Sequence, residues 1–329
     1  LCKKHNVIDF DELLKRTTTD YHYNFLSTTE NGPIQQEIYK VIGEFCTNVI
    51  TNYKTDVDSY QEVQLSKEVA ECALKYWGRV NPDGSVVLSV SNPYALSAYR
   101  RDYPMNYIAS QLGINVRGSS NEGVIATFYL ADDYTSKDVR YDINKKLCKK
   151  IREFGSYAEG IESEYTKARI FNKLICDNMY YEWEDEENKI FSKKTYAHNL
   201  LGLFIYGKGV CETYAYAFST LMNYAGGECY YVNGNATNND YGHAWNIAKM
   251  NNGEWYWFDI DANDDDKNGK EQNRFLCYKN DLYTLDEYCG TDYRFSLESV
   301  PPRATSMDDP AEWYCVEVDE VVYKLNYSL

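Results

Sequence analysis

The chain has 329 residues, more than one average core of roughly 150 residues requires, so one large domain or two modest ones are expected. Hydrophobic residues make up 44% and charged residues 26%, a globular composition that argues against long disorder, collagen or a coiled coil. The 34 Lys and Arg against 50 Asp and Glu give a formal net charge of −16, which would repel a phosphate backbone, so no nucleic-acid partner is expected. Because no apolar stretch approaches the roughly 20 residues that cross a bilayer, no transmembrane segment is predicted.

Periodic apolar residues predict the regular elements of the chain. Apolar side chains at three- and four-residue steps are typical of one helix face, and alternation of apolar and polar side chains is typical of a strand. Up to residue 135 these patterns predict helices over 33–54 and 66–76, the second capped by Ser66, and strands over 86–88 and 124–130. Beyond it they predict helices over 139–151, 161–175 and 211–225 and strands over 229–232, 242–250, 255–260 and 316–325.

Cys211 is the candidate nucleophile of the chain. It follows the turn Gly207-Lys208-Gly209-Val210 and begins a predicted helix, so its sulfur would lie at the positive end of the helix dipole. We therefore expect a lowered pKa for its thiol, although the negative charge of Glu212 acts in the opposite direction. The other nine of the ten cysteines are expected to be small buried apolar residues, and no disulfide framework or C-x-x-C zinc site is predicted.

His243 is the candidate base, one of only four histidines in the chain, and lies inside a predicted strand. His198 lies close before the Gly-rich turn and could line the cleft, but a structural role explains it better. With a three-residue turn at 251–253, strand pairing places His243 opposite Asp261 and both aspartates, Asp259 and Asp261, on its face of the sheet. Either aspartate can then orient the imidazole. A one-residue shift in the strand register would instead place both aspartates on the opposite face of the sheet, out of reach of His243.

Three blocks of the sequence, GKGVCETYA (207–215), GHAWN (242–246) and WYWFDID (255–261), resemble the signature blocks of the transglutaminase-like superfamily. The resemblance covers roughly residues 160–290. It implies an α+β fold with a papain-like transglutaminase core, in which a helix carrying Cys packs on an antiparallel sheet carrying His and Asp.

Matched block by block, the resemblance implies that Cys211 is the nucleophile, His243 the general base and Asp259 the orienting acid, with Asp261 as the alternative acid. Thr213 stands where many bacterial relatives have Gly, and Asp261 follows Asp259 where the common pattern is Asp-x-Thr-Trp. The implied organisation is an N-terminal accessory region that mixes helices and strands, a transglutaminase-like catalytic domain and a C-terminal strand-bearing tail packed on the core. These three parts are expected over residues 1–135, 136–300 and 301–329.

The implied activity is cysteine-dependent acyl transfer, in which the thiolate attacks a peptide or isopeptide amide carbonyl and a thioester forms. Water as the acceptor would make the protein a cysteine protease or amidase, and an amine would make it a cross-linking enzyme. The many exported, hydrolytic bacterial members of the superfamily favour hydrolysis of a protein, peptide or cell-wall-peptide substrate. A catalytically silent module that binds peptide or glycan at the cell surface through the same cleft is the alternative.

Location and cofactors are inferred from weaker signals. The 33 tyrosines suit exposed, pleated surfaces and, with the resemblance, favour a bacterial secreted or cell-surface protein. No cofactor and no metal are expected. The run Asp261-x-Asn263-x-Asp265 mimics the opening of a calcium loop, but Asp266 and Gln272 stand at the positions that need Gly and Glu, so a solvated acidic loop is favoured over calcium. The oligomeric state is not predicted.

Overall fold

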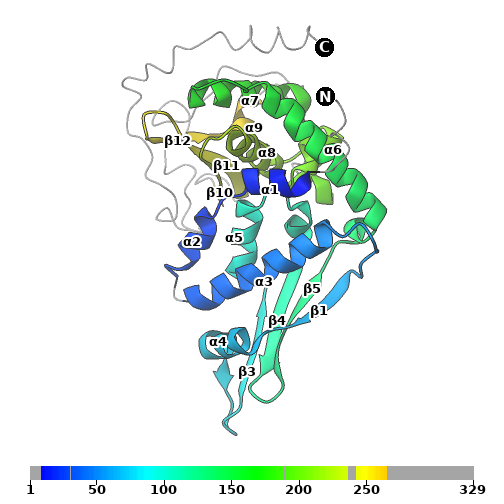
Figure 1. The fold of residues 1–329 in the computed structure, drawn as a ribbon, viewed down its shortest axis with the longest axis vertical. Coiled ribbons are helices and arrows are strands. Elements are labelled where there is room, and N and C mark those ends of the chain that lie inside the picture. The colour runs from blue at the N-terminus through cyan, green and yellow to red at the C-terminus, as the bar shows by residue number, and fades with distance from the viewer. Residues whose placement is uncertain (1–8, 30, 189, 236–241, 265–329) are drawn as a thin grey trace. The chain divides into compact units, whose positions relative to one another are not determined.

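The computed structural model describes residues 9–29, 31–188, 190–235 and 242–264 (Figure 1). Contacts divide the chain into two compact units, one of Thr19–Ile143 and the other of the residues up to Thr18 and from Asn144 onward. Both units combine helices with antiparallel sheets, so the fold is of the α+β class, as expected. In the part of the chain described, no helix is both long and apolar enough to span a membrane.

The unit of Thr19–Ile143 contains a five-stranded antiparallel sheet with strand order β1-β5-β4-β3-β2. Its strands are β1 (Tyr60–Gln64), β2 (Arg79–Val80), β3 (Val86–Ser91), β4 (Gly113–Ser119) and β5 (Gly123–Tyr129). The sequence predicted β3 and β5 but not the other three. β1 and β2 are edge strands of largely exposed or half-buried residues, and such strands carry a weak apolar alternation.

Helices cover one face of this sheet, and α3 lies across it (Figure 1). The helical segments are α2 (Tyr21–Leu26), α3 (Gly32–Ile50), α4 (Lys67–Trp77), α5 (Tyr94–Asp102) and the short turns η1 (Tyr107–Gln111) and η2 (Asp132–Tyr134). The ring of Phe45 in α3 stacks on Phe128 in β5 with centroids 3.9 Å apart. The Ser66 hydroxyl accepts the backbone N–H of Val69 at 3.3 Å, which confirms the expected cap of α4.

A buried carboxylate ties the helices of this unit together. Asp102, at the end of α5, is fully buried and accepts the hydroxyls of Thr19 and Tyr39 at 2.8 and 2.9 Å. It also faces Nδ1 of His22 at 2.9 Å and accepts the backbone N–H of Tyr23 at 2.9 Å. Because a buried charge needs several partners to offset its lost hydration, this arrangement explains how Asp102 is accommodated.

The second unit contains the element that carries Cys211. Its helices are α1 (Phe10–Thr17), α7 (Glu164–Asn178), α8 (Cys211–Tyr224) and α9 (Ile260–Asn263), and α6 (Lys137–Ser156) spans the point where the units divide. Its three-stranded antiparallel sheet has β11 (Gly242–Lys249) between β10 (Cys229–Asn235) and β12 (Trp255–Phe258). Short strand pairs join β6 (Tyr180–Tyr181) to β9 (Lys208–Gly209) and β7 (Trp183–Asp185) to β8 (Ile190–Phe191).

Helix α8 packs on β10 and β11, so the helix that begins at Cys211 lies on the sheet that carries His243. The Asn246 side chain in β11 donates to the carbonyl of Ala215 in α8 at 2.8 Å. The rings of Phe218 and Phe258 lie 5.3 Å apart, and both side chains are fully buried. The predicted relation between the Cys helix and the antiparallel sheet is therefore confirmed.

The hairpin of β11 and β12 has the expected register. Asn246 pairs with Phe258 and Lys249 with Trp255, and the Met250 N–H donates to the Glu254 carbonyl at 2.9 Å. The strand predicted over 255–260 is too long, however: β12 ends at Phe258 and α9 begins at Ile260, so the predicted extent is wrong.

The chain leaves the sheet where α9 begins, because the Asp259 carbonyl accepts the Asn263 N–H at 3.1 Å in a helical turn. The side chain of Ile260, the first residue of this turn, is buried. Asp261 therefore approaches His243 from a turn of helix rather than from a paired strand. The expected C-terminal tail over 301–329, its strand over 316–325 and four of the cysteines (Cys2, Cys277, Cys289 and Cys315) lie outside the described residues.

Candidate active site

Cys211 is the first residue of α8, as the sequence predicted. The strand before it is anchored on both sides, since Gly209 pairs with Tyr181 in a parallel bridge and the Val210 N–H donates to the Ala197 carbonyl at 3.0 Å. The Cys211 side chain is half-buried, whereas Cys46, Cys148, Cys176 and Cys229 are buried. Cys72 is half-buried in the other unit, and these six cysteines are free thiols.

Thr213 stands where the resemblance to the superfamily leads us to expect Gly, and its contacts account for the larger side chain. Its hydroxyl donates to the carbonyl of Ala197 at 2.7 Å and lies 3.1 Å from that of Asn199, so its side chain ties the first turn of α8 to the segment before it. A Cβ on Gly209 would lie 2.4 Å from the Thr213 hydroxyl, and one on Gly202 would lie 2.8 Å from it. The two glycines therefore leave the space that Thr213 fills.

Asp259 holds His243 by one ring nitrogen. His243 Nε2 lies 2.9 Å from Asp259 Oδ2, and Asp259 is 2% exposed. Beside them, the buried Trp245 ring lies 6.0 Å from the His243 ring and nearly parallel to it. With Nε2–H donating to the carboxylate, Nδ1 is the nitrogen that remains to exchange a proton with another group.

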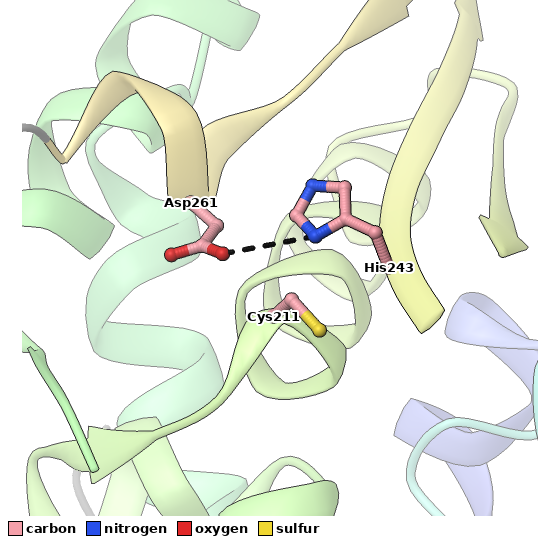
Figure 2. Close-up of side chains that lie close together, drawn as sticks. All are labelled: Cys211, His243 and Asp261. Carbon is pink, nitrogen blue, oxygen red and sulfur yellow. Dashed lines mark ion pairs between the residues drawn. The ribbon is translucent and has the colours of Figure 1, made fainter. Parts of the chain in front are cut away.

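The other side of the ring faces Cys211 and Asp261 (Figure 2). His243 Nδ1 lies 3.9 Å from Asp261 Oδ2. The Cys211 sulfur, a His243 ring nitrogen and an Asp261 oxygen all lie within 4.8 Å of one another. The structure thus brings together all four residues that the sequence nominated, with Asp259 bonded to the imidazole and Asp261 beside the thiol.

Asp259 keeps the imidazole of His243 charged. Burial favours the neutral ring, but the charge of Asp259 and its hydrogen bond outweigh burial and hold the pKa of His243 well above its ordinary value, and Cys211 acts in the same direction. An imidazolium in this position can stabilise a neighbouring thiolate and later give up a proton.

The expected lowering of the Cys211 pKa is wrong in direction. Burial raises the pKa of the Cys211 thiol, and the negative charges of Asp261 and Glu212 add to the rise, while the hydrogen bond and charge of His243 oppose it. The helix N-terminus and the charge of Glu212 are visible in the sequence, whereas the desolvation of the thiol depends on the fold. The thiolate of Cys211 therefore depends on its imidazolium partner.

A thiol, an imidazole and a carboxylate at this spacing suit proton transfer, and the spacing is also compatible with a bound cation. The calcium-loop pattern gains no geometric support from its described members. Asp261 faces His243, and the Asn263 side chain donates to Asn172 at 2.9 Å. Asp265, Asp266 and Gln272 lie outside the described residues.

The thiol opens onto a pocket of about 210 Å³. Side chains that the sequence did not nominate form its walls, and they include Tyr181, Phe191, Tyr231 and Glu212. His198 also lines this pocket, where it is hydrogen-bonded to Glu212. The pocket is large enough for one amino-acid side chain or a short piece of peptide beside the sulfur.

Tyr181 lies next to the backbone of Cys211. Burial raises the pKa of the Tyr181 phenol, with a further rise from the charges of Cys211 and Asp261, while a hydrogen bond from the Cys211 backbone opposes the rise. The phenol therefore stays protonated and lies against the Cys211 N–H, and both residues line the pocket. Two such donors beside a nucleophile can bind a developing oxyanion.

Comparisons with known proteins agree with these residues. The model of the transglutaminase-like superfamily matches residues 154–260, a span that includes Cys211, His243 and Asp259. No match is found among curated proteins.

Two solved structures are similar to parts of the chain. A structure of a TGase is 16% identical with a TM-score of 0.31, over 48% of this chain and 46% of that one, so this chain spans about half of its length. A candidate cysteine protease from Cytophaga hutchinsonii is 15% identical with a TM-score of 0.27, over 67% of this chain and 75% of that one. The similarity to the transglutaminase-like superfamily rests on the match of its model to residues 154–260 and on the three sequence blocks.

Proposed function

We propose that the protein is a cysteine-dependent acyl-transfer enzyme that acts on peptide or isopeptide amide bonds. One observation carries the proposal: Asp259 holds Nε2 of His243 while the other side of the ring faces the sulfur of Cys211. A nucleophile, a base within reach and a group that orients the base are the parts that such chemistry needs.

The geometry supports the following sequence of bond changes. Cys211 reacts as a thiolate paired with the imidazolium of His243, and the thiolate attacks the carbonyl carbon of the amide. The Cys211 N–H and the Tyr181 hydroxyl hold the oxyanion. The imidazolium then donates its proton to the amide nitrogen, the C–N bond breaks, and an amine leaves behind a thioester on Cys211. The acceptor, activated by loss of a proton to His243, attacks the thioester and releases the acyl group and the thiol.

Hydrolysis is the outcome that we propose over cross-linking. Transfer to an amine requires that water be kept away from the thioester. In the structure Cys211, Glu212 and His243 are each half-buried, and they line a pocket that opens to solvent. This access supports water as the acceptor and therefore a protease or amidase activity.

The substrate that we propose is a protein, a peptide or a cell-wall peptide, processed outside the cytoplasm or at the cell surface. The pocket beside Cys211 supports a peptide-sized ligand, with aromatic walls at Tyr181, Phe191 and Tyr231. Export is supported by the 33 tyrosines in 329 residues and by the resemblance to a superfamily with many exported bacterial members. Fractionation of the source cells tests the location independently of the chemistry.

Incubation with casein and a dansylated primary amine tests the reaction. The wild-type protein is expected to release casein peptides or ammonia and to incorporate little of the amine. Cys211→Ser should abolish turnover, whereas Cys72→Ser should not, because Cys72 is also half-buried but belongs to the other unit. Equal turnover by wild type and Cys211→Ser would contradict the proposal. Binding of casein without turnover would favour the silent binding module, and amine incorporation as the main product would favour cross-linking.

A further inference from the structure

A second histidine–carboxylate pair lies in the same pocket as the thiol. His198 ends the 3-10 turn η3 (Thr195–His198), and Glu212 follows Cys211 in α8. His198 Nδ1 is hydrogen-bonded to Glu212 Oε2, and both residues line the pocket together with Cys211 and His243. The bond changes described above use neither member of the pair.

Both ring nitrogens of His198 face acceptors. Nδ1 meets the Glu212 carboxylate, and Nε2 lies 2.7 Å from the Ser192 carbonyl oxygen. A neutral imidazole donates from one nitrogen and an imidazolium from both, so the charged ring fits this site. In agreement, the hydrogen bond to Glu212 raises the pKa of His198, with burial acting against it and the charge of Glu212 adding to the rise.

The charge of Glu212 bears on the thiol next to it in the chain. The carboxylates of Glu212 and Asp261 disfavour the thiolate of Cys211, and His243 favours it. The side chains of His198 and Glu212 are 26% and 38% exposed, so water screens the pair only in part. A positive charge bonded to Glu212 therefore offsets one of the two negative charges that oppose the thiolate.

We propose that His198 is a positioning residue for the thiol chemistry: it fixes the Glu212 carboxylate as one half of a neutral ion pair, anchored to the Ser192 carbonyl, so that the Cys211 thiolate does not form beside a bare anion. The inference rests on the proposed function, because it concerns the reactivity of the nucleophile. Without His198 the carboxylate would be free to approach the sulfur and its charge would be unopposed.

The rate at which iodoacetamide alkylates Cys211 at pH 7, followed by peptide mass spectrometry, tests the role without any substrate. His198→Ala should slow alkylation about threefold, because a rise of one unit in the thiol pKa costs tenfold in thiolate and returns about threefold in nucleophilicity. Glu212→Gln should leave the rate at or above that of the wild type. The double variant His198→Ala/Glu212→Gln should return to near the wild-type rate, since it removes the charge that His198 offsets.

His22→Ala is the matched control, because it removes a buried histidine from a carboxylate, Asp102, in the other unit. It is expected to lower the thermal unfolding temperature and to leave the alkylation of Cys211 unchanged. If His198→Ala does not fold, His198→Gln retains an N–H donor for Glu212 without the charge and should be as slow as predicted for alanine.

Two results would overturn this inference but not the proposed function. One is a reactive Cys211 whose alkylation rate does not change in His198→Ala, and the other is a double variant that reacts as slowly as His198→Ala. The second result would mean that the loss comes from altered packing and not from the charge of Glu212. A wild-type Cys211 that reacts no faster than Cys72 would contradict both the proposed function and this inference.

Discussion

Asp259 determines which nitrogen of His243 is available to the thiol, because its carboxylate lies 2.9 Å from Nε2. Nδ1 then remains on the side of the ring that faces Cys211 and Asp261 (Figure 2). Asp259, which the sequence analysis nominated as the orienting acid, and Asp261, the alternative, therefore hold different positions. Asp259 bonds the imidazole, and Asp261 places a negative charge beside the reacting atoms.

This difference predicts unequal effects of the two alanine variants. Asp259→Ala should lower kcat by about 100-fold or more, because the imidazole loses both its orientation and the charge that keeps it protonated. Asp261→Ala, the matched variant two residues away, should keep kcat within about threefold of the wild type. Steady-state hydrolysis of casein peptides by the two variants measures the contrast. A larger loss in Asp261→Ala would mean that Asp261 is the orienting acid.

Asp261→Asn should make the thiol more reactive. The charge of Asp261 raises the pKa of Cys211, so its removal should lower that pKa and increase the thiolate fraction at neutral pH. We expect alkylation by iodoacetamide to become about twofold to threefold faster at pH 7. The midpoint of the curve of alkylation rate against pH should move to lower pH. A slower rate, or a midpoint shifted upward, would show that Asp261 supports the imidazolium more than it opposes the thiolate.

The pairing of His243 with Asp259 should make stability depend on pH. The folded-state pKa of His243 lies well above the ordinary value of 6.5, so the folded protein binds the proton more tightly than the unfolded chain. The stabilisation is complete below about pH 6.5 and is lost as the pH rises through the raised pKa. Relative to the wild type, His243→Ala should therefore lose about 2 kcal/mol of unfolding free energy at pH 6 and less at pH 9. Urea unfolding at the two pH values measures the difference, and a loss that grows with pH would contradict this assignment.

Gly209→Ala should disturb the site through packing alone. A Cβ at this position would lie 2.4 Å from the Thr213 hydroxyl, whose hydrogen bonds fix the first turn of α8. We expect a loss of about 1–3 kcal/mol in unfolding free energy and a lower kcat, because Cys211 belongs to the same turn. Gly226→Ala is the control. Gly226 has a φ of 85° with no atom within 4 Å of an added Cβ, so this change should cost about 1 kcal/mol through backbone strain and spare kcat.

Local patterns in the sequence were sufficient to predict the part of the site formed by the long elements. The turn at 251–253 fixes the register of β11 and β12, and the Gly-rich turn before Cys211 marks the start of α8. Because these signals are short in range, they are readable without knowledge of the rest of the fold. The turn from Asp259 into α9 was missed, because apolar and acidic residues alternate from Phe258 to Asp261 as they would in a strand.

Apart from His198, the walls of the pocket were beyond prediction for a physical reason. Tyr181 and Phe191 belong to strands of two residues each, which are too short to show an alternation. His198 and Glu212 are 14 residues apart, and they meet because the segment between them folds back through a π-helical turn over 202–206. The upward shift in the Cys211 pKa likewise arises from burial, which tertiary packing decides.

The most direct measurement of the central claim compares the alkylation of Cys211 in the wild type and in His243→Ala. Peptide mapping after brief exposure to iodoacetamide at pH 7 gives the rate for each thiol separately. We expect Cys211 to react fastest of the thiols in the wild type and to slow to the rate of Cys72 in His243→Ala, since burial then leaves its thiol protonated. A Cys211 that reacts equally fast with and without the imidazole would contradict the account.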